Sequence, residues 1–142
     1  MKHLIVQKII AIVLFVFPEI CLSSEVHICP EKVQLSAGSF TVTNVPAGFK
    51  SVISNSPIRL TGINMFDGPP EEEAALLPTK ENGDVSVWKF EGTYESGKWL
   101  SCDYVEGLIR VTTRVADTSV QCSVTAKKSG SPLILRARFV CK

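Results

Sequence analysis

Histidine is scarce in this 142-residue chain, which has only His3 and His27. A Ser-His-Asp triad needs a histidine as general base, and no second histidine follows His27. The Gly-rich phosphate loop and the H-E-x-x-H and G-x-S-x-G motifs are also missing. We therefore expect no catalytic residue, no cofactor and no enzymatic activity.

A charge imbalance is lacking as well. The chain has 15 Lys and Arg residues against 14 Asp and Glu residues. No polybasic or acidic tail is present, whereas nucleic-acid-binding domains usually carry a basic patch or stripe. The sequence therefore predicts no nucleic acid partner.

No hydrophobic run is long enough to cross a bilayer. The nine apolar residues 9–17 fall well short of the about 20 that a transmembrane helix needs. Basic residues before this run and a proline after it are typical of a secretory leader. We predict a signal peptide over residues 1–24, with cleavage after Ser23 or Ser24, and no stable membrane anchor after cleavage. A short permanent anchor is the alternative.

The predicted mature chain, residues 25–142, has the size of one domain. Loss of Lys2, Lys8 and Glu19 with the leader leaves 13 basic and 13 acidic residues. The expected location is the periplasm, or the medium if the protein is secreted further.

Closely spaced cysteine pairs are absent. The mature chain has four cysteines with gaps of 73, 20 and 19 residues, at Cys29, Cys102, Cys122 and Cys141. A structural zinc site typically uses pairs such as C-x-x-C, so no metal site is expected. An even number of cysteines in an oxidising compartment instead predicts two disulfides.

The mature chain does contain a succession of short alternating apolar and polar runs. Leu100, Cys102 and Tyr104 lie on one face of residues 98–104, which we predict to be the central strand. Further strands are predicted at residues 33–35, 40–43, 59–66 and 85–90, and three alternating runs follow residue 104. Asn82-Gly83 is a strong tight-turn signal. The predicted fold is mainly β and antiparallel, with at most a short helix near residues 71–77.

One register keeps the apolar faces matched across the last three connections. Its predicted pairs are Tyr104 with Ile109, Cys102 with Val111, Leu100 with Thr113, Val115 with Val120, Thr113 with Cys122, Val124 with Leu135, and Val120 with Phe139. The side chains predicted to face solvent are Asp103, Arg110, Arg114, Arg136 and Arg138. An arginine-lined ligand surface is the alternative to a plain solvated face.

The four cysteines conflict with a flat sheet in this register. Cys102 and Cys122 lie two strands apart, about 10 Å at the usual strand spacing, whereas a disulfide requires Cα atoms within about 7 Å. Cys141 lies four residues beyond the predicted partner of Cys122. The meander must therefore curl into a small sandwich or barrel. The preferred pairing is Cys102–Cys122 with Cys29–Cys141, and the other pairings stay open.

A rigid acidic loop is the strongest candidate for a binding site. Its predicted binding residues are Asp67, Gly68, Pro69, Pro70, Glu71 and Glu72. The two prolines must end the preceding strand, and Phe66, Leu76 and Leu77 are expected to attach the loop to the core. Loops held by β scaffolds commonly carry recognition. A purely structural crossover is the alternative.

Several motifs together resemble a known family. They are Cys29-Pro30 near the mature start, the F-D-G-P-P-E-E block at residues 66–72, and W-L-x-C-x-Y at residues 99–104. The chain resembles an uncharacterised family of small exported proteobacterial proteins named after a Salmonella locus. This resemblance implies a location in the bacterial envelope and supplies no catalytic residues.

The sequence as a whole favours a non-catalytic binding or inhibitory module of immunity type, with a protein partner in the periplasm. Two alternatives stay open. One is a small envelope hydrolase that uses carboxylates near residues 67–73. The other is a structural or adhesive envelope subunit, whose exposed strand edge would pair with further copies.

Overall fold

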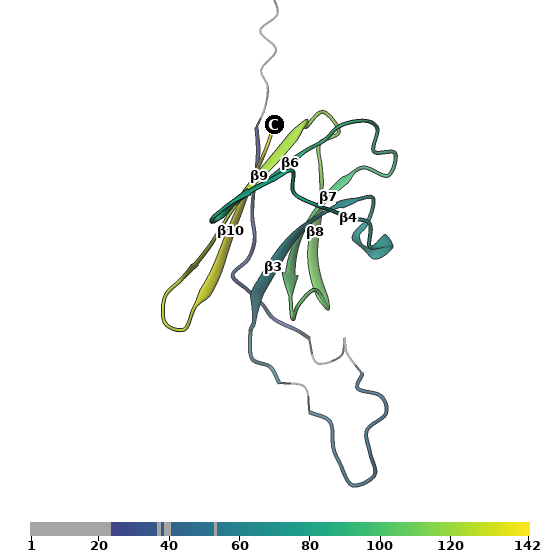
Figure 1. Cartoon of the computed structure of the whole chain (residues 1–142). Helices are drawn as coiled ribbons and strands as arrows, with labels where there is room; N and C mark the ends of the chain where they lie inside the picture. Colours follow the sequence, from purple (N-terminus) through teal and green to yellow (C-terminus); the bar gives the residue numbers. More distant parts are fainter. Residues whose placement is uncertain (1–23, 37, 39–40, 53) are drawn as a thin grey trace, which may run out of the picture.

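Two antiparallel sheets pack face to face in the computed structural model, which describes residues 24–36, 38, 41–52 and 54–142 (Figure 1). Sheet one contains, in spatial order, β1 (Glu25–Ile28), β10 (Ile134–Cys141), β9 (Gln121–Ser129), β6 (Val85–Lys89) and β5 (Lys80–Asn82). Sheet two contains β2 (Lys32–Val33), β3 (Ile58–Asp67), β7 (Lys98–Tyr104) and β8 (Ile109–Val115), with β4 (Ala75–Leu76) also paired to β3. The fold is a sandwich and not a closed barrel.

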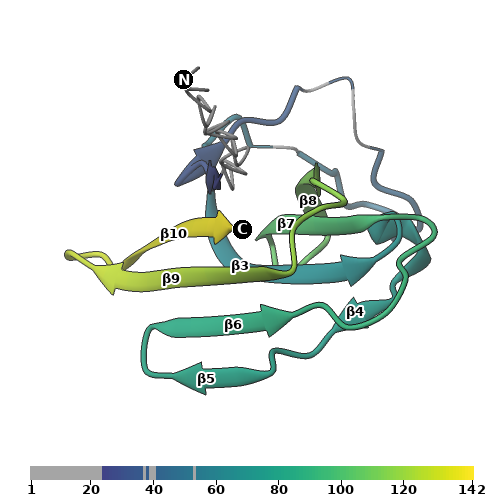
Figure 2. The ribbon, with the colours of Figure 1, turned by 90° about the horizontal axis from the view of Figure 1, so that it is seen from above.

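The two sheets are stacked so that matching edges lie on the same side of the sandwich. Figure 2 shows β8 on the same side of the molecule as β1, and β4 on the side of β5 and β6. On the second side, Trp88 of β6 donates its indole N–H to the carbonyl oxygen of Leu76 in β4 at 2.9 Å. On the first side, the N–H of Ala116 donates to Glu25 Oε2 at 3.0 Å. Polar contacts therefore join the sheets along both sides.

Alternation along the strands supplies the core between the sheets. Fully buried side chains from both sheets meet there, including Met65, Leu100, Tyr104, Val124 and Phe139. Each such side chain contributes about 1.5–3 kcal/mol when it is fully removed from water. Tyr104 also donates its hydroxyl to the carbonyl oxygen of Pro30 at 2.6 Å, and burial raises the pKa of this phenol.

The predicted central strand and the hairpin after it are confirmed. β7 pairs with β3 on one side and with β8 on the other. The three predicted pairs at this hairpin are observed, with Tyr104 opposite Ile109, Cys102 opposite Val111 and Leu100 opposite Thr113. The Asn82-Gly83 turn also forms, between β5 and β6.

The next predicted connection is wrong, and the last is right in its strands but wrong in its register. β8 does not pair with β9, because the chain crosses there from sheet two to sheet one. Thr113 therefore does not lie opposite Cys122, nor Val115 opposite Val120. In the last hairpin β9 and β10 pair as predicted, but Phe139 lies opposite Val124 and not Val120. This is a slip of four residues that leaves the buried faces unchanged.

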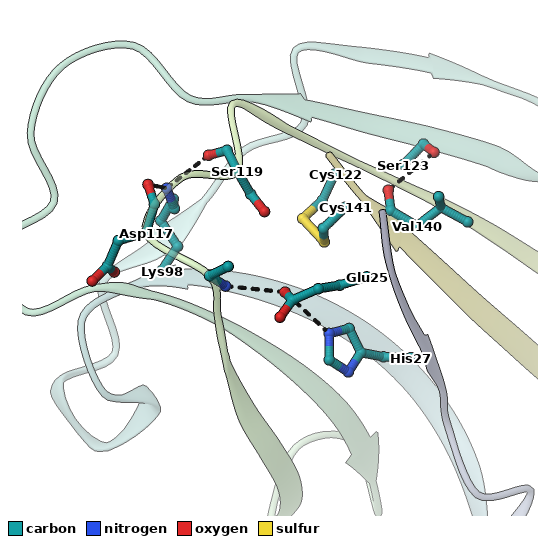
Figure 3. The surroundings of a disulfide bond; sticks show 10 residues. Glu25, His27, Lys98, Asp117, Ser119, Cys122, Ser123, Val140 and Cys141 are labelled. Atoms are coloured by element: carbon teal, nitrogen blue, oxygen red, sulfur yellow. Dashed lines mark hydrogen bonds and ion pairs between the residues drawn. A yellow bond between two sulfur atoms is a disulfide. The ribbon is translucent and has the colours of Figure 1, made fainter. Parts of the chain in front are cut away.

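This four-residue slip explains why the predicted disulfides are wrong. In the observed register Cys122 and Cys141 lie directly opposite each other, with Cα atoms 4.1 Å apart, and they form a disulfide within sheet one (Figure 3). Cys29 bonds to Cys102 in β7 and joins the end of β1 to sheet two, across 73 residues of sequence. Loop closure of that length stabilises the fold by about 4 kcal/mol in the chain-entropy model.

The strands in the early part of the chain differ from the prediction. Of the first predicted strand, residues 33–35, only Val33 lies in β2, and β1 was not predicted. Of residues 40–43, Phe40 lies outside the described residues and the other three are not in a strand. The predicted signal peptide also lies outside the described residues, except for Ser24. Within the described part of the chain, no helix has the length and apolar character needed to cross a membrane.

Candidate functional site

The predicted acidic loop leaves the end of β3 and returns at β4, and backbone hydrogen bonds close it. The N–H of Asp67 donates to the carbonyl oxygen of Ala74 at 2.9 Å, and that of Gly68 donates to Gly97 at 2.8 Å. Between them lies one 3₁₀ turn, η1 (Pro70–Glu72), instead of a longer helix. The loop is thus tied to both β4 and the start of β7.

Arg110 of β8 holds this loop against the outer face of sheet two. Its Nη1 donates to the carbonyl oxygen of Pro70 at 3.1 Å, and its guanidinium lies 5.1 Å from the centre of the Phe66 ring. Phe66 is 2 % exposed but lies outside the main core cluster. Phe66, Pro70 and Arg110 therefore form a second, smaller packing centre on the far side of the sheet from the core.

A buried polar network lies beside this packing centre. The carboxylate of Asp103 accepts hydrogen bonds from Asn64 Nδ2, at 2.6 Å, and from the Ser101 hydroxyl. The Nε of Arg110 lies 4.0 Å from the same carboxylate. The prediction that Asp103 faces solvent is wrong. Its side chain points outward from the sandwich, but the residue is only 3 % exposed, because Arg110 and the acidic loop cover this part of the sheet.

The exposed part of the loop is strongly acidic. Asp67, Glu71, Glu72 and Glu73 are all exposed. Asp67 and Glu72 also line a depression of about 440 Å³ together with Glu95. Within the described residues, no group of acidic, His and Cys side chains is arranged to hold a metal ion. The surface is therefore suited to a basic patch on a partner.

Sequence reasoning found the loop and part of what holds it. Leu76 packs against the core as expected, whereas Leu77 is exposed. Phe66 is buried as expected, but outside the main core cluster, and the anchor that was missed is Arg110. A β-bulge near Leu60 shifts the alternation along β3, so that Leu60 and Met65 face the core while Phe66 faces outward.

The outer face of sheet one differs in charge. A depression of about 550 Å³ there is lined by the exposed residues Lys127, Arg136 and Arg138 among others. Arg136 is paired with Glu31 at 2.5 Å and also donates to Ser129 Oγ at 2.9 Å. The predicted solvent exposure of Arg136 and Arg138 is confirmed.

His27 lies beside Glu25 of the same strand. Its Nε2 lies 3.6 Å from Glu25 Oε2, near the disulfide of sheet one (Figure 3). At the same rim of the sandwich, the Nζ of Lys98 donates to the carbonyl oxygens of Asp117 and Ser119, at 2.9 and 2.7 Å. Burial lowers the pKa of this ammonium, and nearby Asp117 opposes the effect. The contacts of Lys98 hold the start of β7 against the connection between β8 and β9.

Comparison with known proteins gives one family. Residues 54–142 match the family described as Type VI secretion system Tli immunity protein. The chain belongs to this family. No curated protein and no solved structure matches it. The matched part includes the acidic loop, all of sheet two except β2, and four of the five strands of sheet one.

Family membership confirms the predicted class of function. The protein is a non-catalytic, inhibitory module of immunity type, and it binds a partner effector protein. The predicted absence of enzymatic activity agrees with this class. The match supports the predicted resemblance to a small family of periplasmic type, but not the expected Salmonella locus name.

Proposed function

We propose that this chain is a periplasmic immunity protein that neutralises an effector of a type VI secretion system through the acidic loop surface at residues 67–73. The single observation that carries the proposal is a rigid loop whose exposed side chains are nearly all acidic. A rigid loop loses little conformational entropy on binding. Its negative charge speeds association with a basic partner surface.

A periplasmic location is supported by two observations. The leader-like residues 1–24 fit export, and the two disulfides of the fold need an oxidising compartment in which to form. We propose that the leader is removed and that residues 25–142 meet the effector in the periplasm.

A rescue screen tests the function. Each type VI effector of the source strain is produced in the periplasm of a sensitive bacterial host, with or without this chain. We expect the full chain to restore growth against one effector, and a chain without residues 1–24 to fail. If no effector is neutralised, or if the leaderless chain protects equally well, the proposal is wrong in its function or its location, respectively.

The neutralised effector then tests the loop. Glu71→Lys reverses one charge on the loop, and Glu81→Lys makes the same change on the edge strand β5 of the other sheet. We expect Glu71→Lys to slow association by about threefold to tenfold at low salt, and to weaken its dependence on ionic strength. Stopped-flow or surface-based kinetics measure both. Equal rates for the two variants would remove the loop from the interface.

A further inference from the structure

Strand β8 is the longest free edge among the described strands. It has seven residues and pairs only with β7, whereas the edge strands β1, β2 and β5 have four, two and three residues. Five of its seven residues are β-branched, and it contains neither proline nor lysine. Long edges of this composition readily accept a further strand unless they are protected.

Among the described residues, the backbone groups of β8 that face away from β7 have no strand partner. Ala116, just after β8, donates its N–H to Glu25 Oε2 of β1, on the side of the strand away from β7. Backbone groups of alternate residues point to the same side of a strand, so those of Arg110, Thr112 and Arg114 also face away from β7. No strand among the described residues pairs with β8 on that side.

Depressions flank the edge on both faces. The inner one, about 280 Å³, lies between β8 and β1 and is lined by His27, Leu100, Val111 and Thr113 among others. The outer one, about 260 Å³, is lined by Pro70, Glu71, Leu108 and Arg110 among others. Thr112 lines both. An added strand sends alternate side chains to opposite faces, so each depression is placed to receive one set.

The outer depression also offers a positive charge. Arg110 lines it with a side chain that is 28 % exposed, and the nearest carboxylates, those of Asp103 and Glu73, lie 4.0 Å away. An oxygen acceptor on an incoming side chain would form a charge-assisted hydrogen bond with the guanidinium. Pro70 and Glu71 belong to the acidic loop, so this depression continues the surface that we propose for effector binding.

We infer that an extended segment of the effector binds by adding an antiparallel or parallel strand to β8. Its side chains alternate between apolar residues, which enter the inner depression, and polar residues with acceptor oxygens, which face Arg110 and Arg114. This inference rests on the proposed function and specifies its binding mode. A second copy of the chain fits less well, because full antiparallel pairing of two β8 strands places Arg110 directly opposite Arg114, and like charges in that position are destabilising.

The first test changes one edge residue. Thr112→Pro removes an edge-facing N–H, and edge strands tolerate proline, whereas Thr112→Val keeps that N–H and the β-branched shape. We expect Thr112→Pro to weaken binding of the neutralised effector about tenfold or more, since at least one backbone hydrogen bond is lost and the ring obstructs pairing. Thr112→Val should bind like the wild type. Calorimetric titration measures both, and thermal unfolding verifies the fold.

Amide exchange on the unmodified protein provides the second test, which needs no variant to fold. In the free protein the amides of Arg110 and Thr112 should exchange rapidly, and those of Val111 and Thr113 slowly. Bound effector should slow the first pair strongly, as seen by NMR.

The outcomes separate the two proposals. Unchanged exchange at Arg110 and Thr112, or wild-type affinity of a folded Thr112→Pro variant, would overturn the edge proposal while the rescue result stands. Pairing of the free chain with itself through these amides would assign the edge to a second copy. If no effector is neutralised in the rescue screen, both proposals fail.

Discussion

The outer faces of the two sheets differ in the burial of their side chains, although the strands of both sheets alternate in the same way. On sheet two, Phe66 and Asp103 point away from the core and are nevertheless buried, because the loop after β3 and Arg110 cover them. On sheet one, Lys127 and Arg138 point away from the core and stay exposed. Alternation therefore determines which side chains point outward, and the connections determine whether water reaches them.

The largest expected difference between the two faces is at Phe66. Phe66→Ala should lower the free energy of unfolding by about 3–5 kcal/mol, because it removes a buried ring and leaves a cavity under Arg110. Arg138→Ala, at an outward position of sheet one, should change it by less than about 0.5 kcal/mol. Guanidinium unfolding with intact disulfides measures both. Similar decreases in the free energy of unfolding for both variants would show that the two outer faces do not differ in burial.

The polar network around Asp103 should give a smaller difference in stability between the two faces. Asp103→Ala leaves Asn64 and Ser101 without their shared acceptor, and should cost about 1–3 kcal/mol. Ser123→Ala is the control on the outer face of sheet one, where the hydroxyl makes only a 3.5 Å contact with Val140; it should cost less than about 0.5 kcal/mol. The same unfolding assay applies. A neutral Asp103→Ala variant would mean that water replaces the carboxylate, and that the face is less covered than its geometry indicates.

Sequence reasoning succeeded where local pattern alone decides the outcome. The Glu106-Gly107 turn fixes the β7–β8 register, and Asn82-Gly83 fixes the β5–β6 turn. It failed where a choice between distant partners was needed. A slip of four residues in the β9–β10 hairpin keeps Val124 and Phe139 buried, so the hydrophobic pattern cannot detect it.

That slip carried over into the disulfides. With Cys141 displaced from Cys122, the within-sheet disulfide was hidden. A separate error, the predicted pairing of residues 109–115 with residues 120–124, assigned the following strand to the wrong sheet. The acidic loop was recognisable from its prolines and glutamates. Its anchor Arg110 was not, because an arginine that stacks on a phenylalanine has the same place in the alternation as a solvated arginine.

The open basic face of sheet one should be the least sensitive region. Neutralising it with Lys127→Gln and Arg138→Gln should change the free energy of unfolding by less than about 0.5 kcal/mol, since both side chains are exposed. Effector association should also change less than in Glu71→Lys, because the basic depression lies on the other sheet from the acidic loop. Stopped-flow kinetics at two salt concentrations compare the variants. A larger effect of this double change than of Glu71→Lys would move the effector from sheet two to sheet one, and would make the covered face a structural feature alone.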